Sequence, residues 1–240
     1  MDKDFKIIDG ELLEYYGAGG DLIIPNGVTS IADEVFSENL SITSVFIPTS
    51  VRWIGDMVFK CCSNIVRFEV DKNNEFLCSM DGDLYTKDGA ELINYAQGKN
   101  EASVSVPEGV TYIRNVVFKG CKSLERVHIP DTVNRIECAA FRGCTNLTRV
   151  DVPGNVEELV RWTFAECTAL EEVHINDGTW FIGEGVFESC TALRDIYIPD
   201  SVEQILYDAF WACDKLTIHA HKGSYAEEYA KENNITFVAL

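Results

Sequence analysis

Apolar residues recur along the chain at a fixed interval of 23 residues, as from Phe141 to Phe164. Each unit has a phenylalanine, then Cys or Asn three residues later, Leu or Ile six residues later, and an apolar pair at nine and eleven. The phenylalanines are Phe36, Phe59, Phe118, Phe141, Phe164, Phe187 and Phe210. A unit this short cannot bury its apolar face alone, whereas stacked units build a continuous core. The pattern therefore predicts a solenoid.

The apolar pair of each unit predicts a short strand with two side chains inward and one outward between them. Proline cannot donate to a sheet ladder, so it marks the end of this strand. All six prolines occupy this repeat position: Pro25, Pro48, Pro107, Pro130, Pro153 and Pro199. We expect each repeat to contain one parallel strand, a turn after the proline, and a short helical or irregular return around the phenylalanine.

The repeat resembles the units of the BspA-like class of bacterial leucine-rich repeat proteins, as at Leu124, Val127 and Ile129 followed by Pro130. The resemblance covers nearly the whole chain. It implies an α/β right-handed leucine-rich repeat solenoid with a parallel β-sheet face, used for recognition and without an enzymatic site. Members of the class are often secreted or attached to the cell surface.

Both ends of a solenoid need caps over their apolar rungs. Residues 5–16 predict a hairpin, because Asp9-Gly10 between two apolar runs favours a type I′ turn. Near the other end, Ser224 and Glu227 form a capping-box pattern that predicts a helix, followed by a last strand at 235–240. We expect one domain over 1–240, with a hairpin cap at 1–21, repeats at 22–70, an insertion at 71–103, the main array at 104–219 and a helix-strand cap at 220–240.

The insertion carries two further Asp-Gly pairs, Asp81-Gly82 and Asp88-Gly89, each between strand-like runs. These pairs favour a small β-meander that protrudes from the solenoid. The alternative is an irregular rung that continues the stack.

The net charge argues against two classes of partner. The chain has 39 acidic and 20 basic residues, which give a net charge of −19. Nucleic acid and anionic membranes both need Lys and Arg to neutralise their phosphates, so neither is an expected partner. No apolar run reaches the length of a membrane span. The first ten residues do not form a signal peptide, so we expect a cytoplasmic protein if Met1 is the native start, and a secreted or surface protein if a leader was removed.

Nine cysteines suggest disulfides or a metal site, yet six of them share one repeat position between core Phe and Leu residues. Stacked side chains in register keep their Cβ atoms farther apart than a disulfide needs. We therefore expect buried thiols that donate to turn carbonyls, as Asn39 would in the same position, with disulfides and metal as the alternatives. Cys61, Cys78 and Cys138 lie outside this row and should be the more reactive thiols.

The outward strand positions are the candidate binding surface. Mixed charge with aromatic residues suits a protein partner, and a glycan is the alternative. The candidate residues are Phe46, Glu69, Arg126, His128, Arg149, Asp151, Glu172, His174, Asp195 and Tyr197. Among them, His128, Asp151 and His174 fall on three consecutive rungs, where they could hold Zn²⁺ or relay a proton. A row of solvated cross-strand neighbours is the explanation that we favour.

A second candidate patch contains Trp53, Tyr112, Trp180 and Phe181, aromatic residues at or beside the position before a core Ile. They either cover the rim or bind a protein or glycan. The sequence contains no nucleophile elbow, phosphate loop or dinucleotide fingerprint, and we expect no cofactor and no metal. The prediction is a non-catalytic protein-binding or scaffold module. The alternatives are an adhesin-like surface module that recognises host protein or glycan, and a metal-dependent enzyme centred on His128 and His174.

Overall fold

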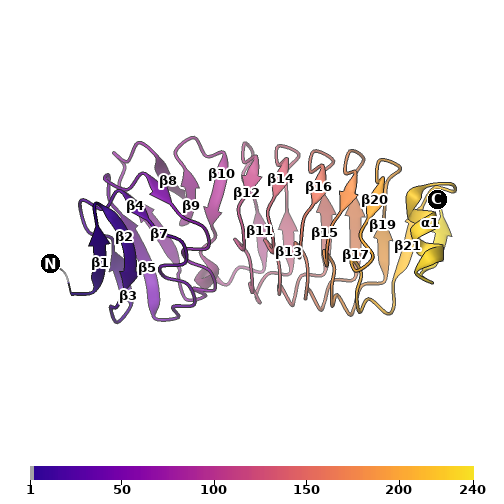
Figure 1. The fold of residues 1–240 in the computed structure, drawn as a ribbon, viewed down its shortest axis with the longest axis horizontal. Helices are drawn as coiled ribbons and strands as arrows, with labels where there is room; N and C mark the ends of the chain where they lie inside the picture. Colours follow the sequence, from indigo (N-terminus) through magenta and orange to yellow (C-terminus); the bar gives the residue numbers. More distant parts are fainter. Residues whose placement is uncertain (1–2) are drawn as a thin grey trace. The chain divides into compact units, whose positions relative to one another are not determined.

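A computed structural model describes residues 3–240, so Met1, on which the prediction of a native start depends, lies outside the described residues. The chain is a parallel-sheet β-solenoid of stacked coils, as predicted (Figure 1). It forms two compact units. Unit 1 contains the residues up to Lys99 with Arg114–Phe118, and unit 2 contains Asn100–Ile113 with Lys119–Leu240. That the whole chain acts as one domain stays a prediction.

Unit 2 contains most of the repeats, and its main sheet has seven parallel strands. They are β11 (Ser103–Ser105), β13 (Arg126–His128), β15 (Arg149–Val152), β17 (Glu172–Ile175), β19 (Asp195–Tyr197), β21 (Thr217–Ala220) and β22 (Thr236–Ala239), in that order. Along β15, Val150 and Val152 are buried and Asp151 is exposed. The apolar pair of each repeat therefore faces the core, as the alternation predicts.

A second, shorter strand follows the proline turn in each repeat, which the sequence pattern did not predict. In unit 2 these two-residue strands are β12 (Tyr112–Ile113), β14 (Arg135–Ile136), β16 (Glu158–Leu159), β18 (Phe181–Ile182) and β20 (Gln204–Ile205). They pair in parallel: β12 pairs with β14, and β18 pairs with β16 on one side and β20 on the other. Two residues are too short for a strand to be recognised from alternation.

The return segments are turns rather than helices, and they are held by a directional hydrogen-bond ladder. In one return, Trp162, Phe164 and Glu166 donate their N–H groups to carbonyls of the next coil at 3.0, 2.9 and 2.7 Å. The N–H groups of the residues between them, Thr163 and Ala165, bond within their own turn. Along this return, the N–H groups therefore alternate between the following coil and the return's own turn.

In every return before the last, the backbone is left-handed at two positions, two residues before and two after the phenylalanine, whereas the last return has only the second of them, at Ala212. Around Phe164, these residues are Trp162 (φ 58°) and Glu166 (φ 60°). Non-glycine residues occupy this region at a cost of about 1–2 kcal/mol each. Gly120 and Gly143 fill the second position in two repeats without that cost.

Stacked phenylalanines run through the core of unit 2. The ring centroids of Phe164 lie 5.2 Å from Phe141 and 5.7 Å from Phe187, and the rings are nearly parallel. Tyr229 closes the stack edge-on against Phe210 at 6.0 Å. Tyr229 belongs to α1 (Tyr225–Glu232), whose first turn is capped by Ser224, as the capping-box pattern predicts.

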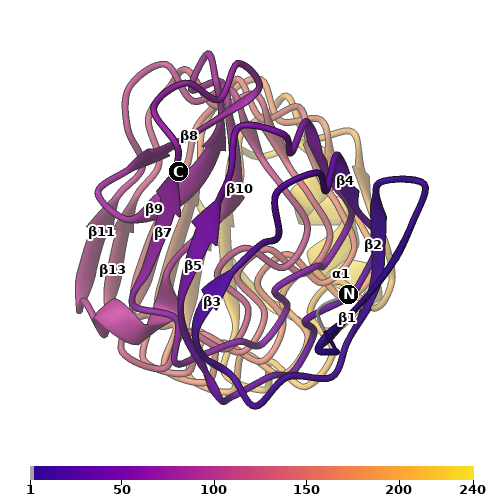
Figure 2. The same ribbon diagram turned by 90° about the vertical axis from the view of Figure 1, so that its left-hand side faces the viewer.

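Unit 1 has the same two strand rows, and Figure 2 shows it from its hairpin end. β1 (Phe5–Ile8) and β2 (Glu11–Tyr15) form the predicted antiparallel hairpin, and Asp9 and Gly10 both have positive φ, as a type I′ turn requires. β4 (Ser30–Ile31) and β6 (Trp53–Ile54) continue from β2. The main row is β3 (Gly20–Ile23), β5 (Ile42–Ile47) and β7 (Arg67–Val70).

The insertion is the predicted antiparallel meander, of β8 (Leu77–Met80), β9 (Asp83–Thr86) and β10 (Glu91–Asn94), followed by a 3-10 turn at Gln97–Lys99. The predicted protrusion is wrong. Leu77, Leu84 and Ile93 are buried in the core cluster of unit 1. The meander is therefore an integral part of that core, because its apolar side chains replace those of a regular rung.

All nine cysteines are free, and the six in the repeat row are buried. Four of these thiols donate to the carbonyl of the phenylalanine in the preceding repeat, for example Cys213 to Phe187 at 3.1 Å. The buried thiol ladder is as predicted. Asn39 differs from the prediction, because its side-chain oxygen accepts from the N–H of Ser41.

Within residues 3–240 no helix is long and apolar enough to cross a membrane.

Candidate functional site

The candidate binding surface in unit 2 is the outward face of strands β13 to β21, called the sheet face below. Register pairs place Asp151, His174, Tyr197 and His219 side by side, one per rung. A second row beside it contains Arg126, Arg149, Glu172 and Asp195. The two rows lie on the same face because they are two residues apart in each strand.

Rings stack along the first row. The imidazole of His174 lies 4.1 Å from the Tyr197 ring and the Tyr197 ring lies 4.6 Å from His219, in both cases with an interplanar angle of 16°. Successive rungs of a parallel sheet are about 4.8 Å apart, so side chains in register meet face to face. The stack fixes the rotamers of three large side chains at the surface.

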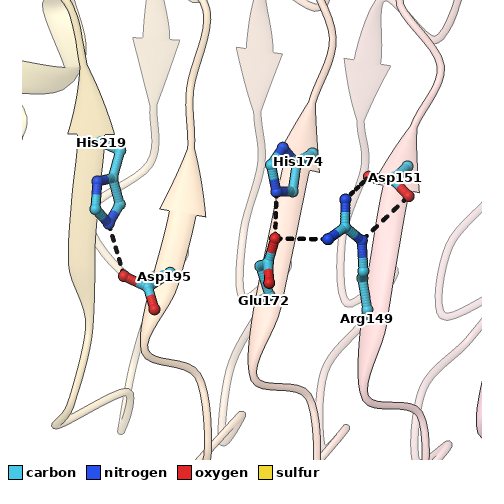
Figure 3. A network of polar contacts seen from close by, with 6 residues as sticks. All are labelled: Arg149, Asp151, Glu172, His174, Asp195 and His219. Carbon is cyan, nitrogen blue, oxygen red and sulfur yellow. Dashed lines mark hydrogen bonds and ion pairs between the residues drawn. The ribbon is translucent and has the colours of Figure 1, made fainter. Parts of the chain in front are cut away.

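Carboxylates of the second row hold the imidazoles in place (Figure 3). Glu172 Oε1 lies 2.5 Å from His174 Nε2, and Asp195 Oδ1 lies 2.6 Å from His219 Nε2. The His219 side chain is largely buried and His174 is partly buried, whereas Glu172 and Asp195 are more exposed. Each imidazole is therefore fixed by a hydrogen bond at one edge and by a stacked ring on its face.

Arg149 joins two of these residues, Asp151 and Glu172. Its guanidinium donates to both oxygens of Asp151, at 3.0 and 3.3 Å, and to Glu172 Oε1 at 2.7 Å (Figure 3). The hydrogen bond with Asp151 raises the pKa of Arg149 further above its ordinary value. The sheet face thus carries a network of opposite charges across rungs β15 and β17.

The hypothesis of a site at His128, Asp151 and His174 does not match this geometry. Asp151 pairs with Arg149, and His174 pairs with Glu172. Within residues 3–240, the structure places no three His, Cys, Asp or Glu side chains where they could hold a metal ion. His128 lies exposed at the edge of an open groove of about 940 Å³ beside the proline turns.

The other candidate residues are distributed over both units. Phe46 and Glu69 face outward as register neighbours in unit 1, where Glu69 pairs with Arg67 at 2.6 Å. Trp53 is also in unit 1 and is half exposed. In unit 2, Tyr112 lies under the guanidinium of Arg135. The partly exposed Trp180 packs beside Phe181, 5.4 Å between ring centroids.

Sequence reasoning missed His219 because the last repeat is shorter by one residue. Tyr197 pairs with His219, 22 residues later, rather than 23. A strict 23-residue period places the next outward position at residue 220, which is buried. The alternation of Leu216, Ile218 and Ala220 around Thr217 and His219 was the signal that would have corrected the register.

Comparisons with known proteins agree with this architecture. A family model described as the BspA type leucine rich repeat region matches residues 12–80 and 94–217, with six copies. No curated protein is similar enough to the chain to count as a match.

Among solved structures, a leucine rich cell surface protein from Faecalibacterium prausnitzii has a TM-score of 0.77 at 26% identity, over 92% of this chain and 64% of its own. A leucine-rich repeat protein from Eubacterium ventriosum has a TM-score of 0.76 at 23% identity, over 83% and 54%, and supports the fold alone. The leucine rich repeat protein of T. pallidum has a TM-score of 0.51 at 28% identity, over 80% and 89%. The chain therefore spans about half to two thirds of the length of the first two structures.

Proposed function

The chain belongs to the BspA-type leucine-rich repeat family, and from this premise we propose that it is a non-catalytic module that binds a protein partner through the sheet face of unit 2. The observation that carries the proposal is the ordered stack of His174, Tyr197 and His219 beside a charge network. Residues that only cover a core do not need such an arrangement at the surface.

Order at the surface lowers the cost of binding. Immobilising a long side chain at an interface costs about 0.5–1.5 kcal/mol, and here stacking and ion pairs have already restricted the rotamers. Tyr and Arg are also the residue types that most often dominate protein interfaces. Tyr197 and Arg149 supply them near the centre of the face.

Charge favours a protein over a polyanion. The net charge of −19 repels phosphate polymers, whereas the sheet face itself mixes Arg126 and Arg149 with Asp151, Glu172 and Asp195. Such a mixed surface discriminates between protein partners by charge complementarity. We infer a folded protein whose surface presents both signs of charge.

A paired capture experiment tests the proposal. Wild type, His174→Ala/Tyr197→Ala and the control His221→Ala/Tyr225→Ala are used as baits in an extract of the cells that make the protein. The control removes the same side-chain types from positions outside the sheet face, where both are exposed. We expect a protein that wild type and control retain and that the sheet-face variant binds at least about tenfold more weakly. If every retained protein binds all three baits equally, the sheet face is not the interface.

A location at the cell surface, with a host protein or glycan as partner, is the second candidate. The observation that favours it is the similarity to the cell surface protein of Faecalibacterium prausnitzii. Labelling of intact cells with an impermeant amine reagent tests it, because a surface protein is labelled before lysis and an internal protein only afterwards.

A further inference from the structure

The last return turn of unit 2, residues 207–214, departs from the repeat pattern in its side chains. Three residues before and one after the phenylalanine, the other repeats have mostly polar or charged residues, such as Arg161 and Glu184 or Arg142 and Glu188. The last repeat has Tyr207 and Trp211, which are 83% and 66% exposed. Burial in the core does not explain these two aromatic residues, since both lie at the surface.

The same turn also leaves backbone donors without acceptors. In the preceding return, Phe187 and Ser189 donate their N–H groups to the carbonyls of Ala209 and Trp211 in the next coil, at 2.8 and 2.7 Å. The corresponding N–H groups of Phe210 and Ala212 have no acceptor among residues 3–240. Trp211 and Cys213 bond within the turn as in the other repeats, and Ala212 keeps the left-handed backbone, although Asp208 does not. The free N–H groups of Phe210 and Ala212 therefore stand at the positions that donate to the following coil in other returns.

A groove of about 530 Å³ lies where the next return would pack. Its walls are the last turn, including Trp211 and Asp214, and the segment after α1, including Asn233 and Asn234. Helix α1 does not fill this space, because it packs deeper, with Tyr229 against Phe210 and its hydroxyl bonded to carbonyls of Leu206 and Tyr207.

We propose that this groove binds an extended peptide segment of a partner protein, which takes the place of the missing return. Its main-chain carbonyls accept from Phe210 and Ala212, in the way that an added strand satisfies a sheet edge. An apolar side chain packs against Trp211 and Tyr207. Because Asp214 is exposed in the wall and the chain carries −19, the peptide has a basic side chain beside the apolar one. This site is separate from the sheet face and does not depend on the function proposed there.

A phage-displayed library of linear random peptides, selected on wild type and counter-selected on Trp211→Ala, provides the probe. We expect enriched peptides that combine apolar and basic residues. Trp211→Ala should lower their affinity by about tenfold or more, the usual loss at an interfacial tryptophan. Trp180→Ala removes an exposed tryptophan elsewhere and Tyr197→Ala alters the sheet face, so both should change the affinity less than about twofold.

Amide NMR spectra of wild type with an enriched peptide test the backbone bonds. We expect the N–H signals of Phe210 and Ala212 to move and to become protected from exchange. The proposal is wrong if no peptide is enriched over Trp211→Ala, if binding is equal in Trp211→Ala and Trp180→Ala, or if the two amides are unaffected. Binding of neutral oligosaccharides such as cellohexaose at Trp211, with no peptide binding, would assign the groove to a carbohydrate and also overturn it.

Discussion

Replacement of a phenylalanine in the middle of the stack is the most direct test of how unit 2 is stabilised. Phe164 is fully buried and lies between Phe141 and Phe187, with ring centroids 5.2 and 5.7 Å away. Phe164→Ala removes the apolar burial, leaves a cavity and breaks two ring contacts. The expected loss in the free energy of unfolding is about 3–5 kcal/mol from burial and cavity, and two stacked pairs place it at the upper end.

Phe181→Ala is the matched control, because it makes the same chemical change at a half-buried position of β18. Its ring contacts Trp180 at the surface, so truncation should cost about 1 kcal/mol. Urea unfolding of both variants, followed by far-UV circular dichroism, measures the difference. Equal losses, or a loss below about 1.5 kcal/mol for Phe164→Ala, would show that the phenylalanine stack is not the main source of stability.

Three further predictions follow from the backbone, the insertion and the thiols. Ala212→Gly, at φ 61°, should raise the free energy of unfolding by about 0.5–1 kcal/mol, whereas Ala192→Gly, outside the positive-φ positions, should lower it by about as much. Urea unfolding compares the two variants, and a change of the same sign in both would contradict the left-handed backbone at Ala212. Leu84→Ala, fully buried in the meander, should cost about 2–5 kcal/mol, and a loss below about 1 kcal/mol would mean that the insertion is dispensable. Burial raises the pKa of Cys62 to about 11 and of Cys213 to about 12. Because these folded values lie above the unfolded one near 8.5, the thiols stabilise the protein fully below about pH 8.5, and that stability is lost as pH rises through 11 to 12. Melts between pH 8 and 11 should show a decline that Cys62→Ala/Cys213→Ala flattens, and an unchanged slope would contradict it.

Much of the fold could be predicted from sequence because the repeat makes the same physical demand many times. A single cysteine would not show whether it is buried, but six cysteines recur three residues after the core phenylalanine of their repeat, which indicates one shared buried position. The hairpin at Asp9-Gly10 and the helix cap at Ser224 were predictable for a different reason, since local backbone chemistry determines them. The two-residue strands, such as Phe181–Ile182, are too short to show alternation.

Features that depend on contacts between segments could not be predicted in the same way. The Asp-Gly pairs indicated strands in the insertion but not which face is buried, and Leu84 and Ile93 decide that by packing into the core. On the sheet face, the row positions of His174 and Tyr197 were predictable from the period. Their stacking and the pairing of Glu172 with both His174 and Arg149 depend on rotamers that the period does not determine.

The groove proposed as a peptide site lies where the regular array of coils ends. Where another coil follows, the N–H groups of residues such as Phe164 and Phe187 donate to it, so these donors contribute to stability. After Phe210 the next element is α1 instead of another coil. Tyr229 of α1 packs against the Phe210 ring, but α1 does not accept hydrogen bonds from the N–H groups of Phe210 and Ala212. Each free N–H group contributes a net gain of about 0.5–1.5 kcal/mol when a carbonyl of the bound segment accepts from it, whereas covering it without an acceptor costs about 1–3 kcal/mol. Binding therefore favours a segment that places carbonyls opposite these groups. Selectivity then depends on the side chains that differ from the repeat, and in this turn those are Tyr207 and Trp211.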